Sequence, residues 1–358
     1  MNSRVLILSR YEPLGSSSRL REFSYIPWLT ARGLSVDIQS LLPDSYVERL
    51  YSGGGRRAFD VLRSYTRRLG YLLTHRRPGV IWLEKELWPY VPASLEAALL
   101  SSVPYVLDVD DAVFHNYDQH RSALVKRFLG HKIDRLFRGA ALVTAGNTYL
   151  ARRALRAGAP WVETVPTVVD LNDYAGGPQN TSARDFTVGW VGSPPTQRHV
   201  QAMSGILSEL LTGDGVRFIT IGTRFKSRLF TGHEEQPWRR ETEAHQLSQF
   251  DVGIMPLPDE PWERGKCGYK LIQYMAAGLP VVASPVGVNK EIVKHGENGF
   301  LADTRHEWRT ALSALKNDVE LRRRMGAAGR RAVQRQYSLQ VTGPRVAAWL
   351  AEIAAARQ

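Results

Sequence analysis

The sequence predicts an α/β protein made of two consecutive domains, each built around a parallel β-sheet. Short apolar runs of strand length alternate with helical segments along the chain, which is typical of a parallel sheet covered on both faces. This alternation stops once, at the polar and turn-rich segment 173–180, and then begins again. With 358 residues, the chain is long enough for two domains of ordinary size.

The first half of the chain opens with a strand, a glycine-containing loop, a helix and a second strand. The strand is expected at 4–9, and the loop contains Gly15 and serines that can cap a helix over about 19–31. This order is typical of a Rossmann-like domain, but the sequence lacks G-x-G-x-x-G and so does not favour a bound dinucleotide. Further strands are predicted at 35–38, 80–83, 105–109 and 141–144.

The second half repeats this pattern after the predicted linker. Its strands are predicted at 186–191, 216–221, 252–255 and 281–283. We therefore predict an N-terminal Rossmann-like domain over residues 1–172 and a C-terminal one over 173–340. A final helix within 341–358 could pack back on either domain, and we assign it to the N-terminal one.

Composition limits the classes of partner and the cellular location. A single cysteine, Cys267, cannot form an internal disulfide and fits a reducing compartment. No signal-peptide pattern is visible, and no apolar run approaches the roughly 20 residues of a membrane span, so we expect a cytoplasmic protein. The net charge of +12 favours anionic partners such as nucleotide diphosphates or anionic lipid, although solvated arginines are the ordinary alternative.

The most distinctive stretch of the chain runs from Gly265 to Asn289. A loop of small residues and lysines leads into a short helix pattern, which stops at Gly278 and is followed by a short buried strand. Backbone N–H groups at the start of this helix, at Tyr269 and Lys270, can hold a phosphate group while lysines neutralise its charge.

The region from Asp251 to Tyr337 resembles the C-terminal domain of retaining glycosyltransferases of the GT-B fold, family 4. The resemblance implies two Rossmann-like domains facing across a cleft, with the acceptor in the N-terminal domain and the nucleotide-sugar donor in the C-terminal one. The N-terminal half matches this family only in pattern. The matching motifs are 249–257, 270–289, 295–301 and 337–338, with weaker likeness at 162–170 and 189–193.

The resemblance implies a donor site at the carboxyl ends of the C-terminal strands. Cations there would stabilise the diphosphate leaving group, whose charge grows in the transition state. Arg224, after a predicted strand, is a weaker candidate for the same phosphates. The predicted donor-binding residues are Gly192, Arg198, Lys266, Gly268, Tyr269, Lys270 and Gln273.

One departure from the family pattern concerns two glutamates separated by seven residues. Alignment on the motif places Gly265 at the first position and Gln273 at the second. Gln273 can accept hydrogen bonds from the donor ribose through its amide oxygen, without charge. Gly265 cannot make the usual sugar contact, and Glu263 could replace it through a shifted loop.

Acidic residues follow the strands of the N-terminal half, where open α/β sheets place their ligands. Glu84, Asp110 and Asp111 are the predicted catalytic residues, which would orient the acceptor hydroxyl or contact the donor sugar; helix capping is the alternative for the two aspartates. Asp108 and Asp110 also form the Asp-x-Asp pattern of metal-dependent GT-A enzymes. Because the GT-B resemblance implies a metal-independent reaction, we expect no metal. His115 is a structural or surface residue on this interpretation.

A basic and amphipathic stretch covers residues 56–77. Its apolar stripe predicts a helix packed on the sheet with a basic outer face. The alternative is an interfacial helix that docks on anionic lipid and brings the enzyme to a lipid-linked acceptor. The stripe comprises Phe59, Leu62, Leu69, Leu72 and Leu73, and the surrounding arginines are Arg56, Arg63, Arg67, Arg68, Arg76 and Arg77.

We therefore expect a retaining glycosyltransferase that moves a sugar from a nucleotide-diphosphate donor to a hydroxyl acceptor, in surface polysaccharide or glycoconjugate synthesis. No cofactor is expected besides the donor as co-substrate. Its expected partners are the donor, a glycan or lipid-linked acceptor, and an anionic surface on the inner face of the plasma membrane. Nucleic acid is not expected, because no recognised binding module is present. The alternatives are a nucleotide-sugar epimerase or hydrolase of the same fold, or a non-catalytic nucleotide- or glycan-binding subunit.

Overall fold

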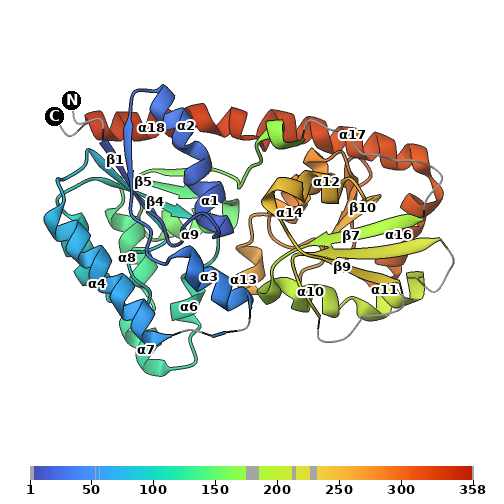
Figure 1. The fold of residues 1–358 in the computed structure, drawn as a ribbon, viewed down its shortest axis with the longest axis horizontal. Coiled ribbons are helices and arrows are strands. Elements are labelled where there is room, and N and C mark those ends of the chain that lie inside the picture. The colour runs from blue at the N-terminus through green and yellow to red at the C-terminus, as the bar shows by residue number, and fades with distance from the viewer. Residues whose placement is uncertain are drawn as a thin grey trace. The chain divides into compact units, whose positions relative to one another are not determined.

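The computed structural model describes residues 4–52, 54–55, 57–174, 185–211, 215–225 and 232–356. Two compact units are present: unit 1 contains Met1–Thr167, Gly265–Cys267 and Thr342–Gln358, and unit 2 contains Val168–Arg264 and Gly268–Val341. Each unit has its own sheet and its own hydrophobic core (Figure 1). Arg56 and most of the predicted linker, residues 175–180, lie outside the described residues.

The sheet of unit 1 has six parallel strands in the order β2-β1-β3-β4-β5-β6. The α/β class and the strands predicted for this half are confirmed, and β6 at its edge is an addition. Every residue of β3, β4 and β5 is buried, because helices cover both faces. The strands are β1 (Arg4–Leu8), β2 (Ser35–Ile38), β3 (Val80–Glu84), β4 (Tyr105–Val109), β5 (Leu142–Ala145) and β6 (Val162–Thr164).

The helices of unit 1 lie on both sides of this sheet, with α2 and α18 on one side and α4 and α8 on the other (Figure 1). The helix expected over 19–31 is interrupted by a short 3-10 turn, because Pro27 lacks an N–H group and cannot continue a helix from the preceding turn. The helices are α1 (Ser16–Arg21), α2 (Ile26–Ala31), α3 (Asp44–Tyr51), α4 (Ala58–Thr74), α5 (Ala93–Leu100), α6 (His115–Asp118), α7 (Ala123–Leu129), α8 (Lys132–Gly139), α9 (Thr148–Arg156) and α18 (Leu339–Ala355).

The C-terminal helix α18 packs in unit 1 from Thr342 onward. The Thr342 hydroxyl lies 2.9 Å from the hydroxyl of Tyr25, and the Trp349 ring meets the Trp161 ring edge-on. A Cβ atom on Gly343 would lie 2.6 Å from the indole ring of Trp28, so this position requires glycine.

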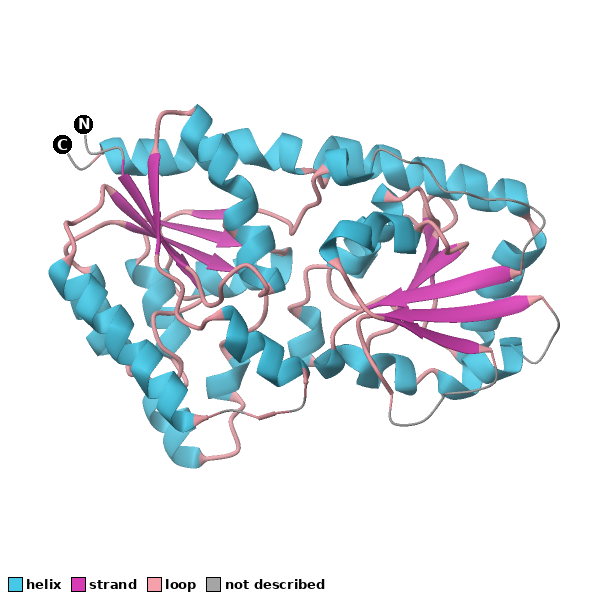
Figure 2. Ribbon diagram, viewed as in Figure 1, coloured by secondary structure: helices cyan, strands magenta, loops and turns pink. Residues whose placement is uncertain are grey.

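The sheet of unit 2 also has six parallel strands, in the order β12-β11-β10-β7-β8-β9 (Figure 2). The four predicted strands are confirmed. Both edge strands were missed, because β9 is polar and β12 has only three residues. The strands are β7 (Phe186–Val191), β8 (Val216–Ile221), β9 (His233–Gln236), β10 (Val252–Met255), β11 (Val281–Ala283) and β12 (Gly299–Leu301).

The helices of unit 2 place α12 and α14 on one side of the sheet and α10 and α11 on the other (Figure 1). Helix α14 lies between Gly268 and Gly278, both with positive φ, which confirms the predicted stop. Among the described residues, every helix is too short or too polar to span a bilayer. The helices are α10 (Gln197–Gln201), α11 (Ser204–Leu211), α12 (Glu243–Leu247), α13 (Pro261–Arg264), α14 (Tyr269–Ala276), α15 (Asn289–Ile292), α16 (Arg305–Asn317) and α17 (Val319–Gln336).

Candidate active site

The loops after β7 and β8 approach each other closely at the carboxyl edge of the unit 2 sheet. Gly192 follows β7, and a Cβ atom there would lie 2.3 Å from the Trp190 ring. Gly222 follows β8 with φ +87°, and a Cβ atom there would lie 2.6 Å from the Gly192 carbonyl oxygen. The predicted residue Gly192 therefore keeps the backbone of this edge compact, and Arg224 lies exposed just beyond Gly222.

A charged cluster forms beside these loops, inside unit 2. The buried carboxylate of Glu263 accepts a hydrogen bond from Arg198 Nη2 at 2.6 Å and lies 3.3 Å from His199 Nε2. The Arg198 side chain is still 62% exposed. Lys270 Nζ lies 5.8 Å from the centre of the Trp190 ring. The structure thus brings two predicted cations, Arg198 and Lys270, to the same edge of the sheet.

His199 is held in its neutral form within this cluster. Burial lowers the pKa of His199, and the nearby Lys270 and Arg198 lower it further, although Glu263 opposes them. Glu263, which the sequence suggested as a substitute sugar contact, instead anchors Arg198 through Oε1. Its second oxygen, Oε2, is buried and accepts no hydrogen bond within the described residues.

Helix α14 begins in a conformation that only glycine adopts easily. Gly268 is the N-cap with φ +67°, and a Cβ atom there would lie 2.4 Å from Ile292 Cδ1. The first intrahelical bond is donated by Leu271 N–H to the Gly268 carbonyl. The N–H groups of Tyr269 and Lys270 therefore precede the hydrogen-bonded ladder, at the positive end of the helix dipole.

Gln273 makes a contact that the sequence did not indicate. Its side chain is buried, and Nε2 donates to Glu243 Oε1 at 2.8 Å. Glu243 also accepts from the Tyr174 hydroxyl at 2.9 Å and from Trp238 Nε1 at 2.5 Å. Because a carboxylate only accepts, the amide nitrogen of Gln273 must face Glu243, which leaves its carbonyl oxygen as the acceptor for another group.

In unit 1, the predicted acids surround a lysine that the sequence did not single out. Lys85 Nζ lies 2.8 Å from Asp110 Oδ1 and 3.6 Å from Glu84 Oε1. Ser17 accepts from Lys85 at 3.0 Å and donates to Asp110 Oδ2 at 2.7 Å. Glu84 Oε2 accepts from the Ser18 hydroxyl at 2.6 Å. Glu84 and Asp110 thus share one ammonium group at the carboxyl edge of the sheet.

These contacts decide the charge of Asp110. Burial alone would raise the pKa of Asp110, but Lys85 and Arg21, with hydrogen bonds from Lys85 and Ser17, hold it below its ordinary value. Burial likewise acts to lower the pKa of Lys85, but Asp110 and Glu84 raise it above its ordinary value. Both groups therefore stay charged near neutral pH, which suits Asp110 to orienting a hydroxyl rather than accepting its proton.

The first aspartate of the Asp-x-Asp pattern is occupied by structural contacts. Asp108 accepts two hydrogen bonds from the Arg21 guanidinium, at 2.6 and 2.9 Å, and one from Thr144 at 2.6 Å. Among the residues that the structure describes, no group of three or more His, Cys, Asp or Glu could hold a metal ion. Metal independence stays a prediction.

The segment Gly265–Cys267 packs within unit 1. Lys266 Nζ pairs with Asp111 Oδ1 at 2.8 Å, so two predicted site residues contact each other. Cys267 is buried and donates to the Asp110 carbonyl, as expected for a packed small residue. A Cβ atom on Gly265 would lie 2.5 Å from Ala112 Cβ, so a glutamate has no room at this family position.

His115 has a structural role in unit 1. Its Nδ1 lies 2.8 Å from Asp118 Oδ1, and its Nε2 lies 2.8 Å from the Tyr149 hydroxyl. Both ring nitrogens are thus engaged by neighbouring side chains, as the sequence interpretation expected.

Most of the apolar stripe of α4 is exposed, which contradicts the expectation that it packs on the sheet; Leu72 is the stripe residue that lies partly buried against the core. The exposed fractions are 74% for Phe59, 62% for Leu62 and 67% for Leu73. The buried face instead carries Arg68, whose guanidinium donates to backbone carbonyls including those of Leu87 and Ser9. Arg68 is therefore excluded from the basic outer surface to which the sequence interpretation assigned it.

Two parallel six-stranded α/β sheets, the second with a glycine-capped helix start beside basic side chains, define the class of GT-B glycosyltransferase folds. Residues 185–318 match the family "Glycosyl transferases group 1". The predicted GT-B fold and the resemblance to glycosyltransferases are thus confirmed.

Two curated relatives are similar over part of the chain. The N-acetyl-alpha-D-glucosaminyl L-malate synthase of Bacillus anthracis is 31% identical over 146 residues, which cover 38% of this chain and 37% of the relative. The GDP-mannose-dependent alpha-mannosyltransferase of Mycolicibacterium smegmatis is 27% identical over 151 residues, which cover 41% of this chain and 38% of the relative. The chain therefore matches well under half the length of these relatives.

Solved structures are similar over nearly the whole chain. A sucrose-phosphate synthase from Thermosynechococcus elongatus has a TM-score of 0.75 at 14% identity, covering 99% of both chains. Anabaena Alr3699/HepE in complex with UDP-glucose has a TM-score of 0.70 at 16% identity, covering 96% of this chain and 98% of the other. At such identities the likeness shows the fold.

Proposed function

We propose that the protein is a retaining glycosyltransferase that transfers a sugar from a nucleotide-diphosphate donor to a hydroxyl acceptor. The observation that carries this proposal is the start of α14, which Gly268 caps and where Lys270 lies at the same edge of the sheet as Arg198. It lies in the part of the chain that matches the glycosyl transferases group 1 family. A relative named as GDP-mannose-dependent and a neighbour in complex with UDP-glucose support this donor class.

The proposed chemistry uses the cations of unit 2 on the leaving group. As the bond to the sugar breaks, negative charge grows on the diphosphate, and fixed cations and helix N–H groups stabilise that charge more in the transition state than in the ground state. Gln273 would accept from the donor ribose through Oε1. The reaction needs no metal in this proposal, because Lys270 and Arg198 neutralise the diphosphate.

Unit 1 takes the acceptor in this proposal. Asp110 is ionised and fixed by Lys85 and Ser17, so it orients the acceptor hydroxyl. The leaving phosphate takes the proton of that hydroxyl, on the same face as the departing group, which preserves the configuration of the sugar. Glu84 fixes the loop after β1 through the Arg10 backbone N–H and helix α1 through the Ser18 hydroxyl, and so acts as a positioning residue.

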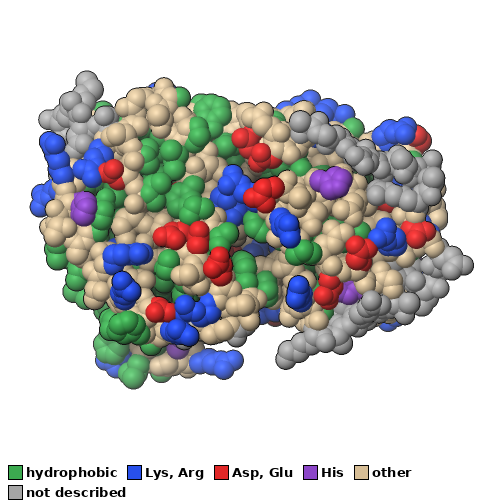
Figure 3. Space-filling model, viewed as in Figure 1, with side chains coloured by type: hydrophobic (Ala, Val, Ile, Leu, Met, Phe, Trp, Pro, Cys, Tyr) green, Lys and Arg blue, Asp and Glu red, His purple; other side chains and the backbone are tan. Residues whose placement is uncertain are grey.

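The acceptor is a glycan or lipid-linked molecule made for the cell surface, and the protein associates with an anionic membrane. The support is the exposed face of α4, where Phe59, Leu62 and Leu73 alternate with Arg63 and Arg67. Figure 3 shows apolar surface beside basic side chains where Figure 1 places α4 and α7. A helix with this composition binds a bilayer by inserting apolar side chains while arginines meet anionic headgroups.

The Lys270→Ala variant tests the donor site. We expect nucleotide-sugar turnover to fall about a hundredfold, as for the loss of one transition-state donor. In thermal unfolding, the variant should also show little of the stabilisation that a nucleoside diphosphate gives the wild type. Lys316→Ala, an exposed lysine near the end of α16, is the matched control and should change neither readout.

Unchanged turnover in Lys270→Ala would refute the proposed site. Turnover that needs no acceptor would favour the alternative of a nucleotide-sugar hydrolase or epimerase. Nucleotide binding without any turnover would favour a non-catalytic binding subunit.

A further inference from the structure

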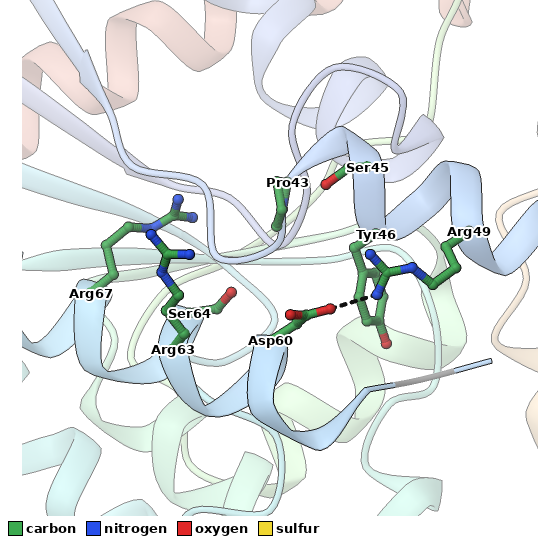
Figure 4. Close-up of a pocket in the computed structure, with 8 residues that line it drawn as sticks. All are labelled: Pro43, Ser45, Tyr46, Arg49, Asp60, Arg63, Ser64 and Arg67. Carbon is green, nitrogen blue, oxygen red and sulfur yellow. Dashed lines mark hydrogen bonds and ion pairs between the residues drawn. The ribbon is translucent and has the colours of Figure 1, made fainter. Parts of the chain in front are cut away.

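A basic pocket lies between α3 and α4 in unit 1. It measures about 310 Å3 and is open to the surface. Figure 4 shows Asp60, Arg63 and Ser64 rising from α4 toward α3, with Arg49 reaching across to Asp60. The lining residues are Pro43, Ser45, Tyr46, Arg49, Asp60, Arg63, Ser64 and Arg67.

The charges of this pocket favour an anion. Three arginines and one carboxylate line it, which leaves an excess of two positive charges among its side chains. Arg49 Nη1 pairs with Asp60 at 2.5 Å, and Arg67 Nη2 is anchored by the carbonyls of Ser40 and Leu41 at 2.9 and 3.0 Å. Arg63 is exposed and has no ion pair among the described side chains, so its guanidinium can meet a ligand.

The surroundings and size of the pocket decide which kind of anion fits. Phe59 and Leu62, next to Asp60 and Arg63 on α4, are 74% and 62% exposed, and Tyr51 at the end of α3 is 52% exposed. A volume of about 310 Å3 lies at the small end of ligand pockets, which suits a headgroup better than a whole nucleotide sugar. Arginines match phosphate oxygens in a bidentate geometry, and flanking apolar side chains match acyl chains.

We propose that the pocket between α3 and α4 binds the phosphate group of a membrane lipid. The inference rests on the proposed function, which assigns the acceptor to unit 1, the unit that contains this pocket. Phosphate contacts come from Arg63, from Arg67 on its unanchored edge, and from the Ser45 and Ser64 hydroxyls that line the pocket. Asp60 pairs with the Arg49 guanidinium and so lowers the affinity of the pocket for the anion.

The test measures binding of the full-length protein to vesicles of phosphatidylcholine containing phosphatidic acid. Vesicles containing oleic acid at matched surface charge carry no added phosphate and serve as the comparison. We expect Arg63→Ala to weaken binding to phosphatidic acid vesicles about tenfold, the equivalent of one charge-assisted hydrogen bond. Arg76→Ala removes the same charge from an exposed position just after α4, outside the pocket, and should change binding far less.

For a second pair of variants, we expect binding to phosphatidic acid vesicles to change in the opposite direction. Asp60→Asn removes the carboxylate that holds Arg49, so binding to phosphatidic acid vesicles should tighten severalfold. Asp37→Asn is a close control: Asp37 is 38% exposed and paired with Arg4, as Asp60 is 39% exposed and paired with Arg49. Thermal unfolding of all four variants checks that they are folded.

The outcomes separate the pocket from surface charge alone. Equal losses in Arg63→Ala and Arg76→Ala, equally tight binding to oleic acid vesicles, or no vesicle binding at low salt would overturn the proposal. Competition by inorganic phosphate in the wild type but not in Arg63→Ala would support it. Binding of inorganic phosphate without any vesicle binding would overturn the lipid as the source. Nucleoside diphosphate binding is measured separately: its absence refutes the proposed function and leaves the pocket result standing.

Discussion

At the scale of single residues, the pair Gln273 and Glu243 is the main departure from the family pattern. The family pattern implies a glutamate at position 273, where this chain has an amide. The nearest carboxylate is that of Glu243, whose Oε1 lies 2.8 Å from Gln273 Nε2. Tyr174 and Trp238 donate to the same carboxylate, so its position is fixed from several sides. Glu243 therefore fixes the orientation of the Gln273 amide, with its nitrogen toward the carboxylate.

Exchanging the side chains of Gln273 and Glu243 tests whether their hydrogen bond couples the two residues. Gln273→Glu places two carboxylates in hydrogen-bond contact, and we expect the free energy of unfolding to fall by about 2 kcal/mol at neutral pH. The double variant Glu243→Gln/Gln273→Glu restores one donor and one acceptor, so stability and stabilisation by nucleoside diphosphate should largely return. Chemical denaturation with and without nucleotide measures both. Additive losses in the double variant would show that the residues are not coupled.

The ion pair between Lys85 and Asp110 should stabilise the fold by an amount that depends on pH. The pKa of Asp110 lies below its unfolded value, so its stabilising contribution is present at neutral pH and is lost as pH falls through the folded pKa. Lys85→Met removes the main counter-charge and should destabilise the protein by about 3 kcal/mol at neutral pH. The loss should shrink toward acid pH, where Asp110 becomes protonated. Urea unfolding at several pH values measures this.

The matched control for Lys85→Met is the double variant with Asp110→Asn, which leaves no unpaired charge on residue 110. Its unfolding free energy should exceed that of Lys85→Met at neutral pH. A loss in Lys85→Met that does not vary with pH would contradict the ion-pair explanation.

At the scale of elements, helix α14 shows how local sequence and packing act together. Its stop at Gly278 can be read from the sequence, but its start depends on a contact. Gly268 is needed both for its φ of +67° and because Ile292, from α15, occupies the space of a side chain. By contrast, a Cβ atom added to Gly70, inside helix α4, would have no neighbouring atom within 4 Å.

Two glycine-to-alanine substitutions should therefore have opposite effects. Gly268→Ala should lower the free energy of unfolding by about 2 kcal/mol, from the left-handed backbone and the crowding of Ile292. Gly70→Ala should raise it by about 1 kcal/mol through helix propensity. Chemical denaturation measures both changes. A neutral Gly268→Ala would contradict the requirement for glycine at the start of this helix.

At the scale of the whole molecule, the chain does not form its units from two uninterrupted segments. Unit 1 gains Gly265–Cys267 and Thr342–Gln358 from beyond unit 2 in the sequence. In consequence, Asp111 and Asp110 obtain partners from residues more than 150 positions away, Lys266 and Cys267. Stability of unit 1 thus depends on residues near the C-terminus, such as Gly343 against Trp28.

Local features could be predicted from the sequence. The alternation of strands and helices gave the α/β class and most strands, because buried strands in parallel sheets are continuous apolar runs. The predicted donor motif was visible because its glycines, lysines and short helix are consecutive. The predicted acids Glu84 and Asp110 come together because parallel strands end on one edge, although their roles stay predictions.

The class of fold, the two sheets and the predicted donor motif can therefore be derived from the sequence, since each depends on residues close together in the chain. Packing between distant segments sets the remaining contacts: Lys85 joins Glu84 to Asp110, Glu243 orients Gln273, and Gly265 faces Ala112. Packing also decides that α4 buries Arg68 and exposes Phe59. A helical stripe shows which residues share a face but not which face meets the sheet, because that depends on partners such as the carbonyls that satisfy Arg68.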